Sequence, residues 1–170
     1  MHVMIATDGS LDASRTALLA SKLASGGGRI TVLTVVEVPR RLLEDMHKAV
    51  GETPSALSGG FAVEYRKDQA GNPPPTQWVG DDAIVDRYVN GTVNSRTAEL
   101  TAEFDAMGVE HSVVGVEGEN AARTVLDVAK NDEADILCVG THGLGRFEGL
   151  LGSTSTKIAR LAPCSVVLVR

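Results

Sequence analysis

The fold of this chain is decided by residues 134–162, which read ADILCVGTHGLGRFEGLLGSTSTKIARLA. The first seven residues form an apolar run typical of a buried strand, and KIARLA at the end has helical spacing. Residues 140–156, which join these two segments, contain five glycines and end in four consecutive hydroxyl residues, 153–156. Glycine allows positive φ and the close approach of a ligand to bare amides, and a helix N-terminus favours an anion. This stretch therefore has the composition of a phosphate-binding loop between a strand and a helix.

Outward from this stretch, strand and helix patterns alternate along the chain. Apolar runs rich in β-branched residues predict strands at 2–7, 29–36, 110–116, 134–140 and 164–169. The first helix is expected to have Ser10 as its N-cap and to stop at the glycines 26–28. Further helices are expected at 82–107, at 120–131 and from 153 to before Pro163. Strands that are apolar on both faces and alternate with helices predict an α/β fold with a doubly wound parallel sheet, in a single domain over residues 1–170.

Residues 39–80 interrupt this alternation. They contain GETPSALSGG and AGNPPPTQWVG, which are turn and linker sequences, preceded by RRLLEDMHKAV, which predicts one short amphipathic helix. We expect a flexible insertion between the second strand and the second long helix of the sheet. A tolerated insertion is favoured over a catalytic lid or a partner-docking segment.

Composition excludes several classes of function. The net charge of −6 argues against a surface built for nucleic acid or anionic lipid, so any anionic ligand needs a local site. No apolar run approaches a membrane span, and the N-terminus lacks a secretory pattern, so the cytoplasm is expected. Cys138 and Cys164 lie in or beside apolar strands and are interpreted as buried thiols, not as a disulfide or metal pair.

Standard nucleotide motifs do not fit the glycine loop. A P-loop string is absent, and the dinucleotide fingerprint fails because Glu148 stands where its third glycine belongs. Asp8 is predicted at the carboxyl end of the first strand, where it would either contact a ligand or brace the Asp-Gly-Ser turn. His142 within the loop is either a ligand contact or an exposed loop residue. No catalytic residue set and no metal-ligand spacing is found, so fast hydrolysis is not expected.

The chain nevertheless resembles the universal stress protein family over almost its whole length. The resemblance is carried by VMIATDGSLDAS at the start, by Gly140-x-x-Gly143 followed by Gly152-Ser153, and by the closing LAPCSVVLV. The family implies five parallel strands in the order 3-2-1-4-5, in a fold of the adenine nucleotide alpha hydrolase-like type. That order would bring Asp8 and the glycine loop to one crevice. Eight residues separate Gly143 from Gly152 where the family usually has nine, so the phosphate-binding glycine is either displaced or accommodated by the loop.

The resemblance also implies roles for individual residues in binding ATP or a related adenine nucleotide. The adenine and ribose end would be lined by Ala6, Thr7, Asp8 and the backbone of Val35. The ribose and α-phosphate side would be lined by Val139, Gly140, His142 and Gly143. The β- and γ-phosphates, with Mg²⁺ or Mn²⁺, would be held by Gly152, Ser153, Thr154 and Ser155.

The family further implies a dimeric sensor or regulator. The last strand, 164–169, is placed by the family order at the sheet edge, where it can pair with a second copy of the chain. A homodimer binding an adenine nucleotide is therefore the favoured prediction. Two alternatives stay open: a dimeric interaction module of the same fold that binds no nucleotide, and a slow ATP hydrolase.

Overall fold

Five parallel strands form one sheet in the computed structural model, which describes residues 1–38, 79–141 and 151–170. The strands are β1 (His2–Ala6), β2 (Arg29–Val36), β3 (Ser112–Glu117), β4 (Ile136–Gly140) and β5 (Ser165–Val169). Their order is β3-β2-β1-β4-β5, and all four pairings are parallel. The predicted doubly wound sheet and its strand order are thus confirmed.

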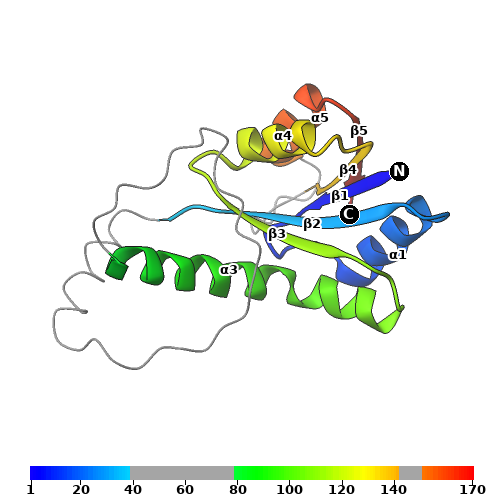
Figure 1. Ribbon diagram of the computed structural model, residues 1–170. Helices are drawn as coiled ribbons and strands as arrows, with labels where there is room; N and C mark the ends of the chain where they lie inside the picture. The colour runs from blue at the N-terminus through cyan, green and yellow to red at the C-terminus, as the bar shows by residue number, and fades with distance from the viewer. Residues whose placement is uncertain (39–78, 142–150) are drawn as a thin grey trace.

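In the described part of the chain, four helices cover the two faces of the sheet, as can be followed in Figure 1. They are α1 (Ala13–Leu23), α3 (Val79–Ala106), α4 (Ala121–Asn131) and α5 (Ser153–Leu161). Helices α1 and α3 lie on one face, and α4 and α5 on the other. The chain fills the sheet from β1 outward to β3 and then returns to the other side of β1 with β4. The strand order therefore reverses between β1 and β4.

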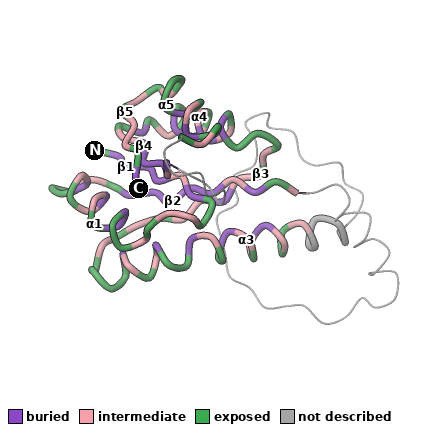
Figure 2. The backbone as a smooth tube through the Cα atoms, turned by 180° about the vertical axis from the view of Figure 1, so that it is seen from behind, coloured by how far each residue is buried: buried purple, intermediate pink, exposed green. Residues whose placement is uncertain are grey.

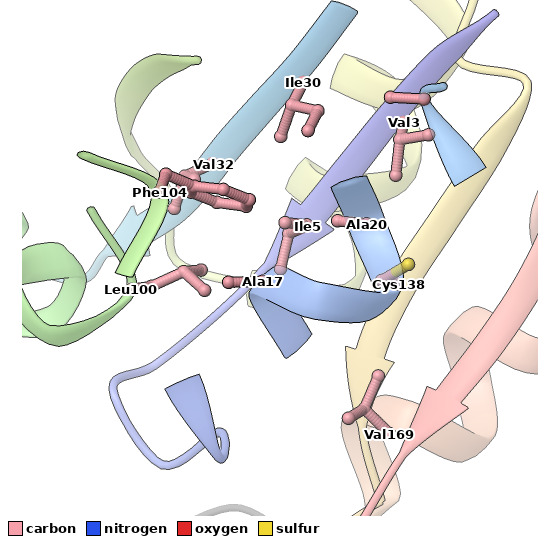
Figure 3. Packing of buried hydrophobic residues seen from close by; sticks show 11 residues of the cluster. Val3, Ile5, Ala17, Ala20, Ile30, Val32, Leu100, Phe104, Cys138 and Val169 are labelled. Atoms are coloured by element: carbon pink, nitrogen blue, oxygen red, sulfur yellow. The ribbon is translucent and has the colours of Figure 1, made fainter. Parts of the chain in front are cut away.

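The hydrophobic core has two layers because side chains alternate along each strand. Val3 and Ile5 of β1 belong to the α1/α3 layer, whereas Met4 belongs to the α4/α5 layer. In Figure 3, the alanines of α1 lie over Ile5, and Phe104 of α3 lies beside Val32. Small residues on α1 allow this helix to pack closely on the sheet.

Burial follows this layered arrangement along the described chain. Figure 2 shows buried residues along the strands and the inward sides of the helices, with exposed residues on the outer sides. Among the described residues, no helix is both long enough and apolar enough to cross a membrane. The predicted short helix at 40–50 and nearly all of the predicted insertion, residues 39–78, lie outside the described residues.

Two helix starts differ from their predicted positions. The N-cap of α1 is Asp12, whose side chain accepts a hydrogen bond from the Arg15 amide at 2.9 Å, so the expectation of Ser10 is wrong. Ser10 is instead held in the preceding turn by Asp8. Helix α3 begins at Val79, three residues before the predicted start at 82. The prediction placed this start too late because the residues up to Gly80 have a turn-forming composition and glycine is a weak helix former.

Candidate functional site

A cavity of about 420 Å³ opens at the carboxyl ends of β1, β2 and β4. In parallel α/β sheets, ligands bind at the carboxyl ends of the strands, at the point where the strand order reverses. Ten of the twelve predicted site residues line the cavity: Ala6, Thr7, Asp8, Val35, Val139, Gly140, Gly152, Ser153, Thr154 and Ser155. The other two, His142 and Gly143, lie outside the described residues. The structure therefore brings the described candidates together from three strands and one helix.

One end of the cavity is apolar. It is formed by Leu33 and Val35 of β2 and by Ala121 and Val125 of α4, of which the sequence analysis selected only Val35. Leu11 and Leu151 are further apolar lining residues that the sequence analysis did not select. Val125 is buried and lies one helical turn after Ala121, near the start of α4. Alternation along β2 could have identified Leu33, since it lies two residues from Val35 and shares its face. This end offers a flat aromatic ligand an apolar surface.

The turn after β1 forms another wall of the cavity. The Gly9 amide donates to Thr7 Oγ1 at 2.9 Å, and the Ser10 amide donates to Asp8 Oδ1 at 3.0 Å. The Ser10 hydroxyl also donates to Asp8 Oδ1. Asp8 thus braces the Asp-Gly-Ser turn, and its exposed carboxylate lines the cavity as well.

The opposite end of the cavity is formed by the start of α5. The N-cap of this helix is Gly152, which has no side chain to satisfy the first amides, whereas the side chains of Asp12 and Asn120 cap α1 and α4. The first backbone bond of α5 runs from the Thr156 amide to the Gly152 carbonyl, at 2.8 Å. The amides of residues 153–155 therefore have no carbonyl acceptor within the helix itself. Together with the helix dipole, they suit an anion.

The hydroxyls at this helix start differ in what they can do. Ser153 and Thr154 are exposed at the cavity, so their hydroxyls can face a ligand. Ser155 is buried, and its hydroxyl donates to the Gly140 carbonyl at 2.5 Å. That hydrogen bond ties the start of α5 to the end of β4. Ser155 can therefore offer an anion its backbone amide, while its hydroxyl hydrogen is already engaged.

A cation outside the predicted set lies beside the apolar end. Nη1 of Arg96, on α3, donates to the carbonyl oxygen of Val35 at 2.8 Å. Sequence reasoning missed this residue because the contact joins positions 61 residues apart and depends on how α3 packs on the sheet. No local pattern around Arg96 indicates it.

The described part of the chain contains no protein cluster suited to a resident metal ion. Asp8 is the one acidic residue among the cavity-lining residues described. The described cysteines are free, and burial raises the pKa of the Cys138 thiol to about 11. Burial also raises the pKa of Cys164, with a smaller contribution from the nearby charge of Asp135. Cys138 is buried as interpreted, whereas Cys164 is only half-buried, so the interpretation of Cys164 as a buried thiol is wrong. Both thiols are less acidic than an ordinary cysteine.

Comparisons with known proteins agree with this architecture. A universal stress protein encoded 3′ of the QAH/OAS sulfhydrylase of Thermus aquaticus is 46% identical over 50 residues, which cover 29% of this chain and 36% of the relative. The matches to three curated relatives span 36, 43 and 49% of those proteins' lengths. These local similarities support common ancestry in the matched segments.

Solved structures match over nearly the whole chain. A universal stress protein in complex with cAMP superposes with a TM-score of 0.55 at 17% identity, covering 100% of this chain and 96% of that one. The universal stress protein of Archaeoglobus fulgidus in complex with dAMP gives a TM-score of 0.50 at 17% identity, covering 100% and 98%. At these identities the likeness concerns the fold. The sequence profile of the universal stress protein family, however, matches residues 1–170, and the chain therefore belongs to that family.

Proposed function

We propose that this protein binds ATP or a related adenine nucleotide in the cavity at the β1/β4 edge and acts in the cytoplasm as a dimeric stress-response regulator. The observation that carries the proposal is the polarity of the cavity. One end is apolar, with Leu33, Val35 and Val125, and the other is the start of α5, which has no side-chain cap. A nucleotide has the same division between a flat base and an anionic tail.

The expected orientation of the nucleotide follows from these two ends. The base lies against the apolar wall, where burying its ring area is favourable. The phosphates lie at the amides of residues 153–155 and the hydroxyls of Ser153 and Thr154. Two fold relatives were solved with cAMP and dAMP, which supports an adenine nucleotide as the ligand class.

Mg²⁺ or Mn²⁺ fits this proposal as a companion of the phosphates. Mg²⁺ is commonly bound through one or two carboxylates plus substrate phosphates. The described cavity supplies one carboxylate, that of Asp8, together with serine and threonine hydroxyls. When bound, the ion would neutralise phosphate charge, and Asp8 would hold it at the side of the turn after β1.

Homodimerisation through β5 is the second part of the proposal. This strand is at the edge of the sheet, and its residue Leu168 is 41% exposed. The Val169 carbonyl accepts from the Thr141 amide, on the side of β4, so by alternation the backbone of Leu168 faces outward. A second copy of β5 can pair with that outward edge.

The dimer is tested by sedimentation velocity on the wild type and on Leu168→Pro. Proline removes an outward amide and spares the ladder to β4, so the variant is expected to be a folded monomer. Thermal unfolding reports whether it folds. A monomeric wild type, or a Leu168→Pro variant that stays dimeric, would contradict pairing through β5.

Nucleotide binding is tested by equilibrium dialysis with ATP, with and without Mg²⁺. Ala121→Phe places a ring in the apolar end of the cavity from an exposed helix position and should abolish binding. The matched control is Ala159→Phe, an equivalent change at an exposed position of α5 away from the cavity, which should bind as the wild type does. Undetectable binding to the wild type at millimolar ATP would refute the proposal and leave an interaction module without nucleotide.

A further inference from the structure

Arg96 donates a hydrogen bond to the backbone carbonyl of Val35, a residue that lines the apolar end of the cavity. Arg96 is half-buried on α3, and its Nη1 lies 2.8 Å from the Val35 carbonyl oxygen. Val35 itself lines the cavity together with Leu33 and Val125. The guanidinium reaches this carbonyl from the α3 face of the sheet, whereas the apolar wall lies on the α4 face.

The ends of the strands explain why this carbonyl is available. The Thr7 amide donates to the Leu33 carbonyl at 2.9 Å, after which the chain turns away from the sheet. Strand β2 continues to Val36, whose carbonyl accepts from Gly118 on the side of β3. By alternation, the carbonyl of Val35 faces the side that β1 has already left. Arg96 supplies the donor that a longer β1 would have supplied.

The position of Arg96 is fixed by the turn after β1. Gly9 has φ of +90°, and a Cβ added there would lie 3.3 Å from the Arg96 Cα. The backbone of α3 therefore lies directly against the turn that carries Asp8. The Cα of Arg96 is therefore held close to this turn, and from that position its guanidinium reaches the Val35 carbonyl.

Nucleobases are distinguished by the donors and acceptors on their edges. Adenine carries an amino donor at position 6, whereas hypoxanthine and guanine carry an oxo acceptor there. A free Val35 carbonyl would favour the amino group. A carbonyl already bonded to a guanidinium is a weaker acceptor, and the adjacent positive charge reduces the repulsion between that carbonyl and an oxo oxygen.

We propose that Arg96 is a specificity-determining residue that relaxes the preference of the cavity for adenine, so that 6-oxopurine nucleotides bind beside adenine nucleotides. The inference rests on the proposed nucleotide-binding function. Arg96 acts through the Val35 carbonyl, and its signature is therefore a change in the ratio of two affinities, which a purely structural role would not produce.

The experiment compares ATP with ITP, which differ only at position 6 and in the protonation of N1. Dissociation constants of both are measured by equilibrium dialysis for the wild type, Arg96→Met and Arg87→Met. Methionine keeps an unbranched side chain with good helix propensity and removes the charge. Arg87 is exposed on the same helix and serves as the charge-matched control.

The wild type and Arg87→Met are expected to bind the two nucleotides within about threefold of each other, since less than one net hydrogen bond separates them. Arg96→Met should favour ATP by about tenfold, the value of one regained hydrogen bond. Thermal unfolding confirms that each variant folds, and Arg96→Gln repeats the test if methionine prevents folding.

The outcomes separate this inference from the function on which it rests. An unchanged ATP-to-ITP ratio in folded Arg96 variants, or a wild type that binds ATP and rejects ITP, overturns the role of Arg96 and leaves nucleotide binding intact. If the wild type binds neither nucleotide, the proposed function fails and this inference fails with it.

Discussion

Replacing Gly9 with alanine tests the close packing between α3 and the turn after β1, which forms one wall of the cavity. Gly9 adopts φ of +90°, a conformation that costs a residue with a Cβ about 1–3 kcal/mol. The new Cβ would also lie 3.3 Å from the Arg96 Cα, closer than most such contacts, and the neighbour is helix backbone. We therefore expect the free energy of unfolding to fall by the strain plus a contribution from displacing the turn.

The magnitude can be divided with a matched control, Gly26→Ala. Gly26 has φ of +92°, and apart from its chain neighbours no described residue has an atom within 4 Å of an added Cβ, so this variant carries the backbone strain alone. In a chain of this size, about 1 kcal/mol corresponds to roughly 2–4 °C in Tm. Gly26→Ala is expected to lower Tm by about 2–12 °C through strain of about 1–3 kcal/mol, and Gly9→Ala by several degrees more.

Calorimetry and ATP dialysis on the two variants decide the matter. Because Asp8 and Ser10 line the cavity, displacement of their turn should also weaken ATP binding in Gly9→Ala, while Gly26→Ala binds normally. Equal losses of Tm in both variants, with unchanged ATP affinity in both, would refute the claim that α3 and the turn are tightly joined.

Four further predictions concern buried polar groups. Thr34→Val should raise the free energy of unfolding by about 1 kcal/mol, because Thr34 Oγ1 is buried without a hydrogen-bond partner among the described residues. Thr31→Val on the same strand should lower the free energy of unfolding by about 1–2 kcal/mol, because Thr31 Oγ1 lies 2.9 Å from His2 Nε2. Urea unfolding measures the stability of both threonine variants. A Thr31→Val variant more stable than the wild type would contradict the hydrogen bond between Thr31 and His2. Burial lowers the pKa of His2 below its ordinary 6.5, so at pH values between the folded and unfolded pKa the unfolded chain binds more protons than the folded one. The free energy of unfolding should therefore fall as the pH drops below about 6.5, with a slope of at most about 1.4 kcal/mol per pH unit. The variant His2→Gln should remove this slope. Ser155→Ala should cost about 1–3 kcal/mol, because it leaves the Gly140 carbonyl without its hydroxyl donor, and a neutral result in urea unfolding would contradict the tie between α5 and β4.

Much of the fold could be predicted from the chain because its signals are local. The β-branched runs predict strands, and the glycines at 26–28 predict the end of the first helix, both through short-range preferences. The strand order came from the resemblance and is confirmed. The start of α1 was misplaced because Ser10 and Asp12 are both good capping residues. Asp8 engages Ser10 in the turn, which leaves Asp12 to cap the helix.

In the candidate site, too, the residues with local sequence signals were predicted, and those that depend on long-range packing were missed. Residues in the loops at strand ends were predicted together and line one cavity in the structure. Ala121 and Val125 were missed as site residues because an apolar helix position that faces a cavity has the same sequence pattern as one that faces the core. Arg96 was missed because its contact with Val35 depends on the packing of α3 against the turn after β1, which no local preference specifies.

The central claim is that the uncapped start of α5 and the end of β1 grip the phosphates and sugar of one nucleotide. The most direct test is a ¹H–¹⁵N correlation spectrum of the protein titrated with ATP. We predict saturable shifts of the amides of Thr7, Asp8 and Gly140 and of residues 153–155, with the amino end of the sheet around Arg29 unchanged. A spectrum that ATP leaves unaltered, or shifts confined to residues away from the cavity, would contradict the account.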